Sequence, residues 1–415
     1  MRRTIGMLLA LATWLGGCAP DDPATRLDQL IEREWLARLT EFPEFATSVG
    51  VHERNHLLTS MTIDDLARRD KMWRGLLEQL DEIDPGRLTT EDRIDYEMLR
   101  DQLEERTESF RFGDYQIPIN SESGFHTGFA RLPFDVPLDD ADDYDDYIAR
   151  MRAWPALVDQ QITLMRIGLD RGMTPPRVVL AGVERTMEAQ LVEEPRDSDF
   201  YAPFRAFPVG VSAAEHERLE RAGRAAIAES IVPGYRALRD FFVGEYVPAA
   251  RETLGASALP DGAVYYAWRV RWYTTLDIDA DEIHELGLSE VARIRAEMTG
   301  VIARTGFEGS FDEFLTFLRE DPRFYAKTPQ QLLERAAWIT KRMDGELPAL
   351  FGRLPRLPYT VEPVPDGIAA RYTAGRYVGA PVGSSQPGRY WVNTYALETR
   401  PLYTLEALSL HEAVP

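Results

Sequence analysis

The residues with the clearest chemical potential are His411 and Glu412, which lie in the run Leu410-His411-Glu412-Ala413-Val414-Pro415. A His-Glu pair on an apolar helix is how many zinc hydrolases begin their metal site: the histidine binds the ion and the glutamate polarises the attacking water. The dipeptide alone is a weak signal, because further zinc ligands are needed. A second pair, His284-Glu285, has Leu288 at the i+4 position and forms no HExxH motif. We therefore interpret His284 as a surface or packing histidine.

A short segment before the pair has the composition of a β-strand, namely Arg389-Tyr390-Trp391-Val392-Asn393. In many zinc peptidases an edge strand beside the metal helix binds an extended peptide through main-chain hydrogen bonds. We therefore expect this strand to align a substrate, with Arg389, Tyr390 and Asn393 as substrate-binding residues. Asn393 is the polar candidate nearest the His-Glu pair.

Other candidates have simpler interpretations. Seven aspartates crowd residues 135–146, but the glycine and distal glutamate of a calcium loop are missing, so we favour the start of a helix. His52 and His56 lie in a segment that reads as a loop, and we expect exposed or hydrogen-bonded side chains. Neither a G-x-S-x-G elbow nor a phosphate-binding loop is present.

The elements that must position these residues are mostly helical. Apolar residues recur at helical spacing. Capping residues mark the start of several of these segments, and Gly or Pro marks the end of others. We predict helices over residues 66–83, 90–103, 158–169, 279–306, 310–319 and 329–344. Near Leu354 the composition changes to Pro, Gly, Tyr and Val, which indicates a small β region before the helix that carries His411. The fold class is therefore mainly α, with a small β region next to the metal-motif helix.

The N-terminal residues have the pattern of a bacterial lipoprotein signal. Arg2 and Arg3 precede a short apolar run, and Leu15-Gly16-Gly17-Cys18 resembles a lipobox. We expect Cys18 to be lipidated and the protein to be exported, anchored to a membrane by lipid and facing the periplasm. The alternative is a stray or buried thiol after an ordinary signal peptide.

Composition narrows the classes of partner. Hydrophobic residues make up 44% of the chain, enough for a large core. Cys18 is the only cysteine, so no intrachain disulfide can form. The formal net charge of −21 argues against nucleic acid and against electrostatic docking on anionic lipid. A peptide substrate and the lipid anchor are the partners we expect, and the sequence leaves the oligomeric state open.

Short stretches along the chain resemble the bacterial family called domain of unknown function 885. The resembling stretches are Glu44-Phe45-Ala46-Thr47-Ser48-Val49-Gly50, Asp92-Arg93-Ile94-Asp95-Tyr96, Gly262-Ala263-Val264-Tyr265-Tyr266, Glu282-Ile283-His284-Glu285-Leu286-Gly287-Leu288 with Glu290-Val291, Pro387-Gly388-Arg389-Tyr390-Trp391-Val392-Asn393, and Leu410-His411-Glu412-Ala413-Val414-Pro415. The resemblance implies a zincin-like metallopeptidase with a motif similar to H-E-x-x-P-G-H-H. His411 would then be the first zinc ligand and Glu412 the general base.

The resemblance also implies that the family's remaining zinc ligands lie after this motif, so we expect the chain to be truncated within it. We expect five regions, which are a signal peptide (1–17), a tether (18–25), a helical body (26–353), a β region (354–400) and the start of the metal-motif helix (401–415). The expected function is zinc-dependent peptide hydrolysis in the cell envelope. The alternative is a non-catalytic lipoprotein that serves as a binding or scaffold module.

One ligand does not hold zinc against solvent, because catalytic sites use three protein ligands. We therefore predict that the 415-residue chain by itself retains no stoichiometric zinc and cleaves no peptide, although the full-length protein would use zinc. Metal analysis of the purified chain checks this, and one zinc per chain would contradict it.

Overall fold

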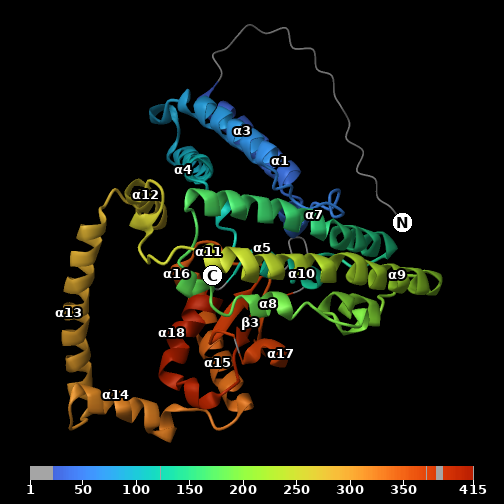
Figure 1. Ribbon diagram of the computed structural model, residues 1–415. Helices are drawn as coiled ribbons and strands as arrows, with labels where there is room; N and C mark the ends of the chain where they lie inside the picture. Colours follow the sequence, from blue (N-terminus) through green and yellow to red (C-terminus); the bar gives the residue numbers. More distant parts are fainter. Residues whose placement is uncertain (1–21, 122, 371, 380–386, 415) are drawn as a thin grey trace. The chain divides into compact units, whose positions relative to one another are not determined.

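The computed structural model describes residues 22–121, 123–370, 372–379 and 387–414, and Cys18 lies outside these ranges. The chain divides into two compact units, one reaching Trp272 and the other formed mainly by the residues from Tyr273 onward. Helix accounts for 68% of the structure and strand for 5%, which confirms the mainly α fold class with a small sheet. Figure 1 shows the elements of both units.

Three helices begin the first unit and share an apolar core. They are α1 (Pro23–Glu41), α3 (Ile63–Asp81) and α4 (Thr90–Phe112), and the short α2 (Pro43–Ser48) lies between the first two in sequence. Trp73, Leu80 and Leu103 lie at the centre of this core. The Thr89 hydroxyl accepts the Asp92 amide at the start of α4, and left-handed Gly113 ends the helix.

The larger core of the first unit surrounds α7 (Ala141–Arg171), which packs against α9 (Ala213–Ala226) and α10 (Val232–Phe241). Figure 1 shows α9 and α10 in line with each other, beside α7. Trp154 of α7 stacks on Phe129 with ring centroids 4.2 Å apart and contacts Tyr235 at 4.7 Å. The remaining short helices of this unit are α5 (Phe125–Phe129), α6 (Leu132–Asp135), α8 (Glu184–Glu188) and α11 (Val247–Ala249), and α12 (Gly262–Thr274) follows them.

Two wide turns interrupt the helix that continues from α9. They are the π-helical segments η6 (Ile227–Ile231) and η7 (Phe242–Tyr246), and a Val-Pro pair follows each of them. In η6, the Val232 N–H reaches back five residues to the Ile227 carbonyl. Pro233 has no N–H to offer the carbonyl four residues earlier, and the wider turn accommodates the missing bond.

The second unit contains the sheet and the His-Glu helix. Its long helices are α13 (Ala280–Thr305), α14 (Phe311–Glu320), α15 (Pro329–Asp344) and α18 (Leu402–Ala413), and its short ones are α16 (Leu347–Leu350) and α17 (Asp366–Ala369). The sheet has the order β1-β3-β2, with β1 (Tyr359–Pro363) parallel and β2 (Gly375–Val378) antiparallel to β3 (Gly388–Val392).

The predicted helix starts and stops are confirmed where capping residues mark them. The Asp279 carboxylate accepts the Glu282 amide, Ser310 and Glu313 form a capping box, and Gly172 and Gly306 end their helices in the left-handed conformation. The predicted apolar stripe on α13 is present, but no residue of this helix is buried. Among the described residues, no helix is both long and apolar enough to span a membrane.

His126 provides a pH-dependent test of the first unit's core. Burial lowers the pKa of its imidazole from 6.5 to about 4, and the Thr186 hydroxyl lies 2.8 Å from Nε2. The folded state therefore holds the neutral ring, whereas the unfolded chain takes up a proton below pH 6.5. The contribution of the neutral His126 ring to the free energy of unfolding is fully present above pH 6.5. It falls by about 1.4 kcal/mol per pH unit as the pH drops toward 4.

We predict that His126→Gln, which removes the titrating group and keeps a hydrogen-bonding side chain, weakens this pH dependence. Urea unfolding of both proteins at pH 7 and pH 5 measures it. Equal losses of stability in the two proteins would show that His126 is not the source.

Candidate active site

The His-Glu pair lies on α18, whose apolar face determines where the pair points. Leu405, Ser409 and Ala413 are spaced by four residues and buried, and this face packs against α15. His411 lies off this stripe and is exposed, whereas Glu412 is half-buried. The helix therefore presents the imidazole to solvent and directs the carboxylate toward the sheet.

Glu412 is attached to the sheet by a backbone hydrogen bond. Its Oε2 accepts the N–H of Tyr377 at 2.9 Å. Tyr377 belongs to β2, an edge strand, and its ring packs edge-to-face against Tyr359 of β1, with centroids 6.2 Å apart. Among the described residues this strand is paired on one side only, so the carboxylate lies beside a sheet edge.

The predicted strand at 389–393 is confirmed as β3, but it is the central strand. Its residues pair with β1 on one side, where Gly388 lies opposite Tyr359. They pair with β2 on the other side, where Val392 lies opposite Gly375. Both sides of its backbone are already hydrogen-bonded. A peptide cannot add to β3 as a further strand, so the main-chain aligning role expected for this strand is available only at the edges of the sheet.

The three residues predicted to bind substrate have different environments. Tyr390 is fully buried, and its hydroxyl lies 3.3 Å from the Ser409 hydroxyl of α18. Burial is the main cause that raises the pKa of the Tyr390 phenol, and the negative charge of Glu412 adds to it. Arg389 is exposed, and its guanidinium lies over the Trp391 ring.

Asn393 supports a loop from inside the protein. Its Nδ2 donates to the carbonyls of Ala369, Tyr372 and Thr373 at 2.9–3.1 Å, and its Oδ1 accepts the Tyr395 N–H at 3.0 Å. The side chain is completely buried. All its hydrogen-bonding atoms are engaged within the chain, so it stabilises the loop that leads into β2.

The donors around His411 do not complete a metal site. Within the described ranges, no group of three or more His, Cys, Asp and Glu side chains is placed to hold a metal ion. His284 is exposed on α13, as expected, and His52 and His56 are exposed in a loop. His411 is therefore the one zinc-ligand candidate that the motif supplies among these residues.

The aspartate-rich segment is confirmed as a helix start. Asp140 is the N-cap of α7, and its carboxylate accepts the amides of Asp142 and Asp143. The Asp143 carboxylate in turn accepts the Asp140 N–H, which completes a capping box. These carboxylates satisfy backbone donors that the helix leaves free.

Two contacts of the site were not foreseen, namely the Tyr377 N–H bound by Glu412 and the Ser409 hydroxyl beside Tyr390. The β propensity of residues 372–382 indicates a strand, but pairing order is a tertiary property that composition does not carry. Ser409 occupies the buried stripe of α18, and a lone serine among leucines is a detectable sign of a polar contact in the core.

Comparisons with known proteins give a family and a fold. Residues 43–415 match the profile of a family described as bacterial protein of unknown function, DUF885. No match was found among the curated proteins.

Two solved structures are similar to this chain. One is described as "the putative lipoprotein from Colwellia psychrerythraea", with a TM-score of 0.85, 20% identity, and coverage of 95% of this chain and 71% of that one. The other is "a putative lipoprotein of unknown function from Shewanella oneidensis", with a TM-score of 0.62, 16% identity, and coverage of 95% and 70%. At these identities the likeness is one of fold.

The hydrogen bonds of Asn393 yield a prediction that separates support of the loop from substrate contact. Asn393→Ala leaves buried carbonyls and an amide without partners, and we expect it to reduce the unfolding free energy by about 1–3 kcal/mol. Arg389→Ala, in the same region but exposed, is the matched control and should change stability by less than about 0.5 kcal/mol. Thermal and urea unfolding measure both variants, and unchanged stability in Asn393→Ala would contradict the supporting role.

Proposed function

The chain belongs to the bacterial family of unknown function DUF885, and we propose that its gene product is a peptide hydrolase whose reaction centre lies where α18 meets β2. The observation that carries the proposal is the hydrogen bond from the Tyr377 N–H to Glu412, at 2.9 Å. It brings a carboxylate from a His-Glu pair to the edge of a sheet. An extended peptide can add to such an edge by main-chain hydrogen bonds, which would bring a scissile amide beside Glu412.

Glu412 is the general base in this proposal. Its carboxylate would accept a proton from the water that attacks the peptide carbonyl, and would then deliver that proton to the leaving amine nitrogen as the C–N bond breaks. The half-buried position suits this role, since the carboxylate lies at a sheet edge, where the Tyr377 N–H holds it until a peptide takes that N–H. Arg389, exposed on the central strand, is available to contact a substrate side chain.

Zinc is the cofactor that a His-Glu pair on a helix suggests, and His411 would be one of its ligands. A catalytic zinc site requires about three protein ligands. The described residues place no such group of donors together, so they do not by themselves fit the ion. The residues that support hydrolysis here are therefore Glu412 and those of the strand edge.

The proposed location is the cell envelope, with a lipid on Cys18 as the anchor. The support is the lipobox-like order of residues 15–18 and the fold shared with two proteins described as putative lipoproteins. A single lipid-modified cysteine tethers a protein to a membrane without a spanning helix. Mass spectrometry of the protein from its native membrane would show a lipid-modified N-terminal cysteine.

We predict that Glu412→Gln lowers kcat for peptide cleavage by about 10²–10⁴-fold, because an amide cannot accept the proton. The protein is produced from its gene in an envelope-targeted form and assayed on short fluorogenic peptides. Intact casein serves as the long protein substrate. Glu406→Gln, on the exposed side of the same helix, is the control and should retain full activity.

His411→Ala provides the second measurement. If the residue is a zinc ligand, the variant loses both activity and bound zinc by metal analysis. Absence of cleavage of any peptide by the wild-type gene product would favour the binding or scaffold alternative. Full activity in Glu412→Gln would exclude the proposed base.

A further inference from the structure

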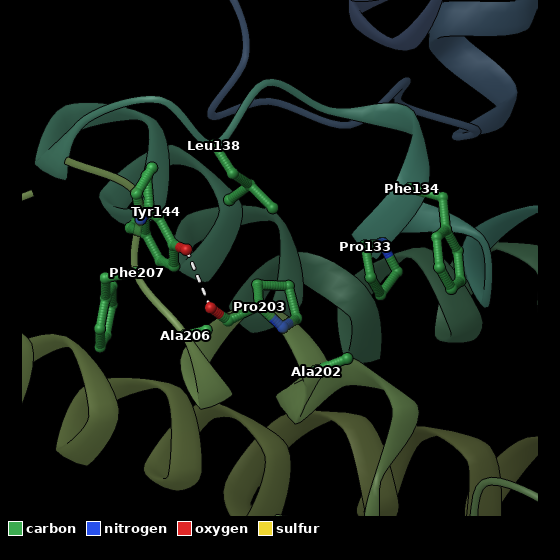
Figure 2. A pocket seen from close by; sticks show the side chains of 9 residues that line it. Pro133, Phe134, Leu138, Tyr144, Ala202, Pro203, Ala206 and Phe207 are labelled. Atoms are coloured by element: carbon green, nitrogen blue, oxygen red, sulfur yellow. Dashed lines mark hydrogen bonds between the residues drawn. The ribbon is translucent and has the colours of Figure 1, made fainter. Parts of the chain in front are cut away.

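A shallow pocket of about 410 Å³ opens on the first unit, away in sequence from the His-Glu helix. Its walls come from α6, the start of α7 and the segment 202–208. Figure 2 shows the lining side chains in a row, from Phe207 and Tyr144 at one end, past Leu138 and Pro203, to Phe134 at the other. The volume falls in the range of about 300–1,000 Å³ that is usual for ligand sites.

The side chains that line the pocket are apolar, apart from one hydroxyl. Three of the nine lining residues are proline and three are aromatic. The one side-chain hydroxyl among them, on Tyr144, donates to the Pro203 carbonyl at 2.8 Å, and Figure 2 shows this bond. The wall side chains therefore offer a ligand mainly apolar contacts, and polar contacts come from the backbone.

One large apolar side chain of the pocket lining and one beside it in sequence are strongly exposed. Phe134 is 76% exposed at one end, and Val209, next to the lining residue Pro208, is completely exposed. Exposed apolar side chains beside a concave apolar surface mark interaction sites more often than isolated ones do. Prolines in the walls hold this surface rigid, which reduces the entropy cost of binding.

The residues that flank the pocket lining in sequence, here called the rim, are rich in aspartate. Asp135, Asp139 and Asp143 are the sequence neighbours of the lining residues Phe134, Leu138 and Tyr144. Asp135 is paired with Arg131, and Asp143 belongs to the capping box of α7.

Asp139 and Asp142 are exposed. Residues 131–143 contain five aspartates and one arginine, Arg131. The excess charge of this segment is therefore negative.

We propose that this pocket is a docking site for an extended, proline-containing peptide segment of a partner protein that carries lysine or arginine beside its apolar residues. Aromatic-lined grooves accept extended proline-rich segments, whose conformation is already ordered before binding, and three lining residues of this pocket are aromatic. The carboxylates at the rim attract the basic flanks of the segment. This inference is independent of peptide hydrolysis at α18.

The test uses the full protein and a fluorescein-labelled peptide in which alternating prolines and leucines are flanked by two arginines at each end. Fluorescence anisotropy at low salt should show saturable binding that weakens at 0.5 M NaCl, because screening acts on exposed charges. The same peptide with glutamates in place of the arginines should not bind.

Matched variants locate the site. Phe134→Ser should weaken binding about tenfold, the loss expected from one buried aromatic contact. Leu254→Ser is the control, since Leu254 is 71% exposed at a different position of the same unit, and it should bind normally.

Two double variants that remove the same charge separate local attraction at the rim from the effect of the protein's net charge. The double change Asp139→Asn with Asp142→Asn should weaken binding severalfold, whereas Asp95→Asn with Asp101→Asn, on exposed positions of α4, removes the same charge and should leave binding unchanged. Equal effects of the two pairs would overturn the proposal. Absence of saturable binding, or normal binding by Phe134→Ser in a folded protein, would also overturn it.

Discussion

The packing of α18 against the sheet and α15 is the constraint on which the candidate site depends. Leu405, Ser409 and Ala413 form a narrow stripe because two of them are small, and this allows the helix to approach its neighbours closely. With this stripe buried, helical geometry fixes the remaining directions. His411 must face outward, and Glu412 must reach the sheet edge. The directions of the His411 and Glu412 side chains therefore follow from how the buried stripe of α18 packs in the core.

The second constraint is that buried backbone groups must be hydrogen-bonded. β3 satisfies it by pairing on both sides, which places it at the centre and leaves β1 and β2 as edges. Asn393 satisfies it for the loop before β2, where its amide bonds three carbonyls. A loop held from within in this way presents β2 in a fixed position beside α18. The same side chain would lose that role if it turned outward to a substrate.

The sequence was most informative where a residue type has one strong local use. The helix ends at Asp279, Ser310 and Gly306 could be predicted because capping and left-handed backbone are local properties. The structure agrees with each of them. The strand at 389–393 was also recognisable from its composition.

Its place in the sheet was not recognisable, because strand order depends on contacts with residues about 15 and 30 positions earlier. For the same reason, Arg389, Tyr390 and Asn393 formed one group in the sequence but have three different environments in the structure. The change of amino-acid composition near Leu354 precedes β1. The two units divide near Trp272, inside α12, where a continuous helix gives no sign of a boundary in the sequence.

The bond between Glu412 and Tyr377 has a consequence for how a peptide could bind. A strand that adds to the free edge of β2 requires the outward N–H groups of that edge, and Glu412 already accepts one of them. A single N–H donates one strong hydrogen bond, so a peptide carbonyl at this position competes with the carboxylate. Arrival of the peptide and release of Glu412 would then be one event, and the base would become free for its proton when the substrate is in place. Under the proposed function, the hydrogen bond to Tyr377 would therefore keep the Glu412 carboxylate engaged until a substrate displaced it.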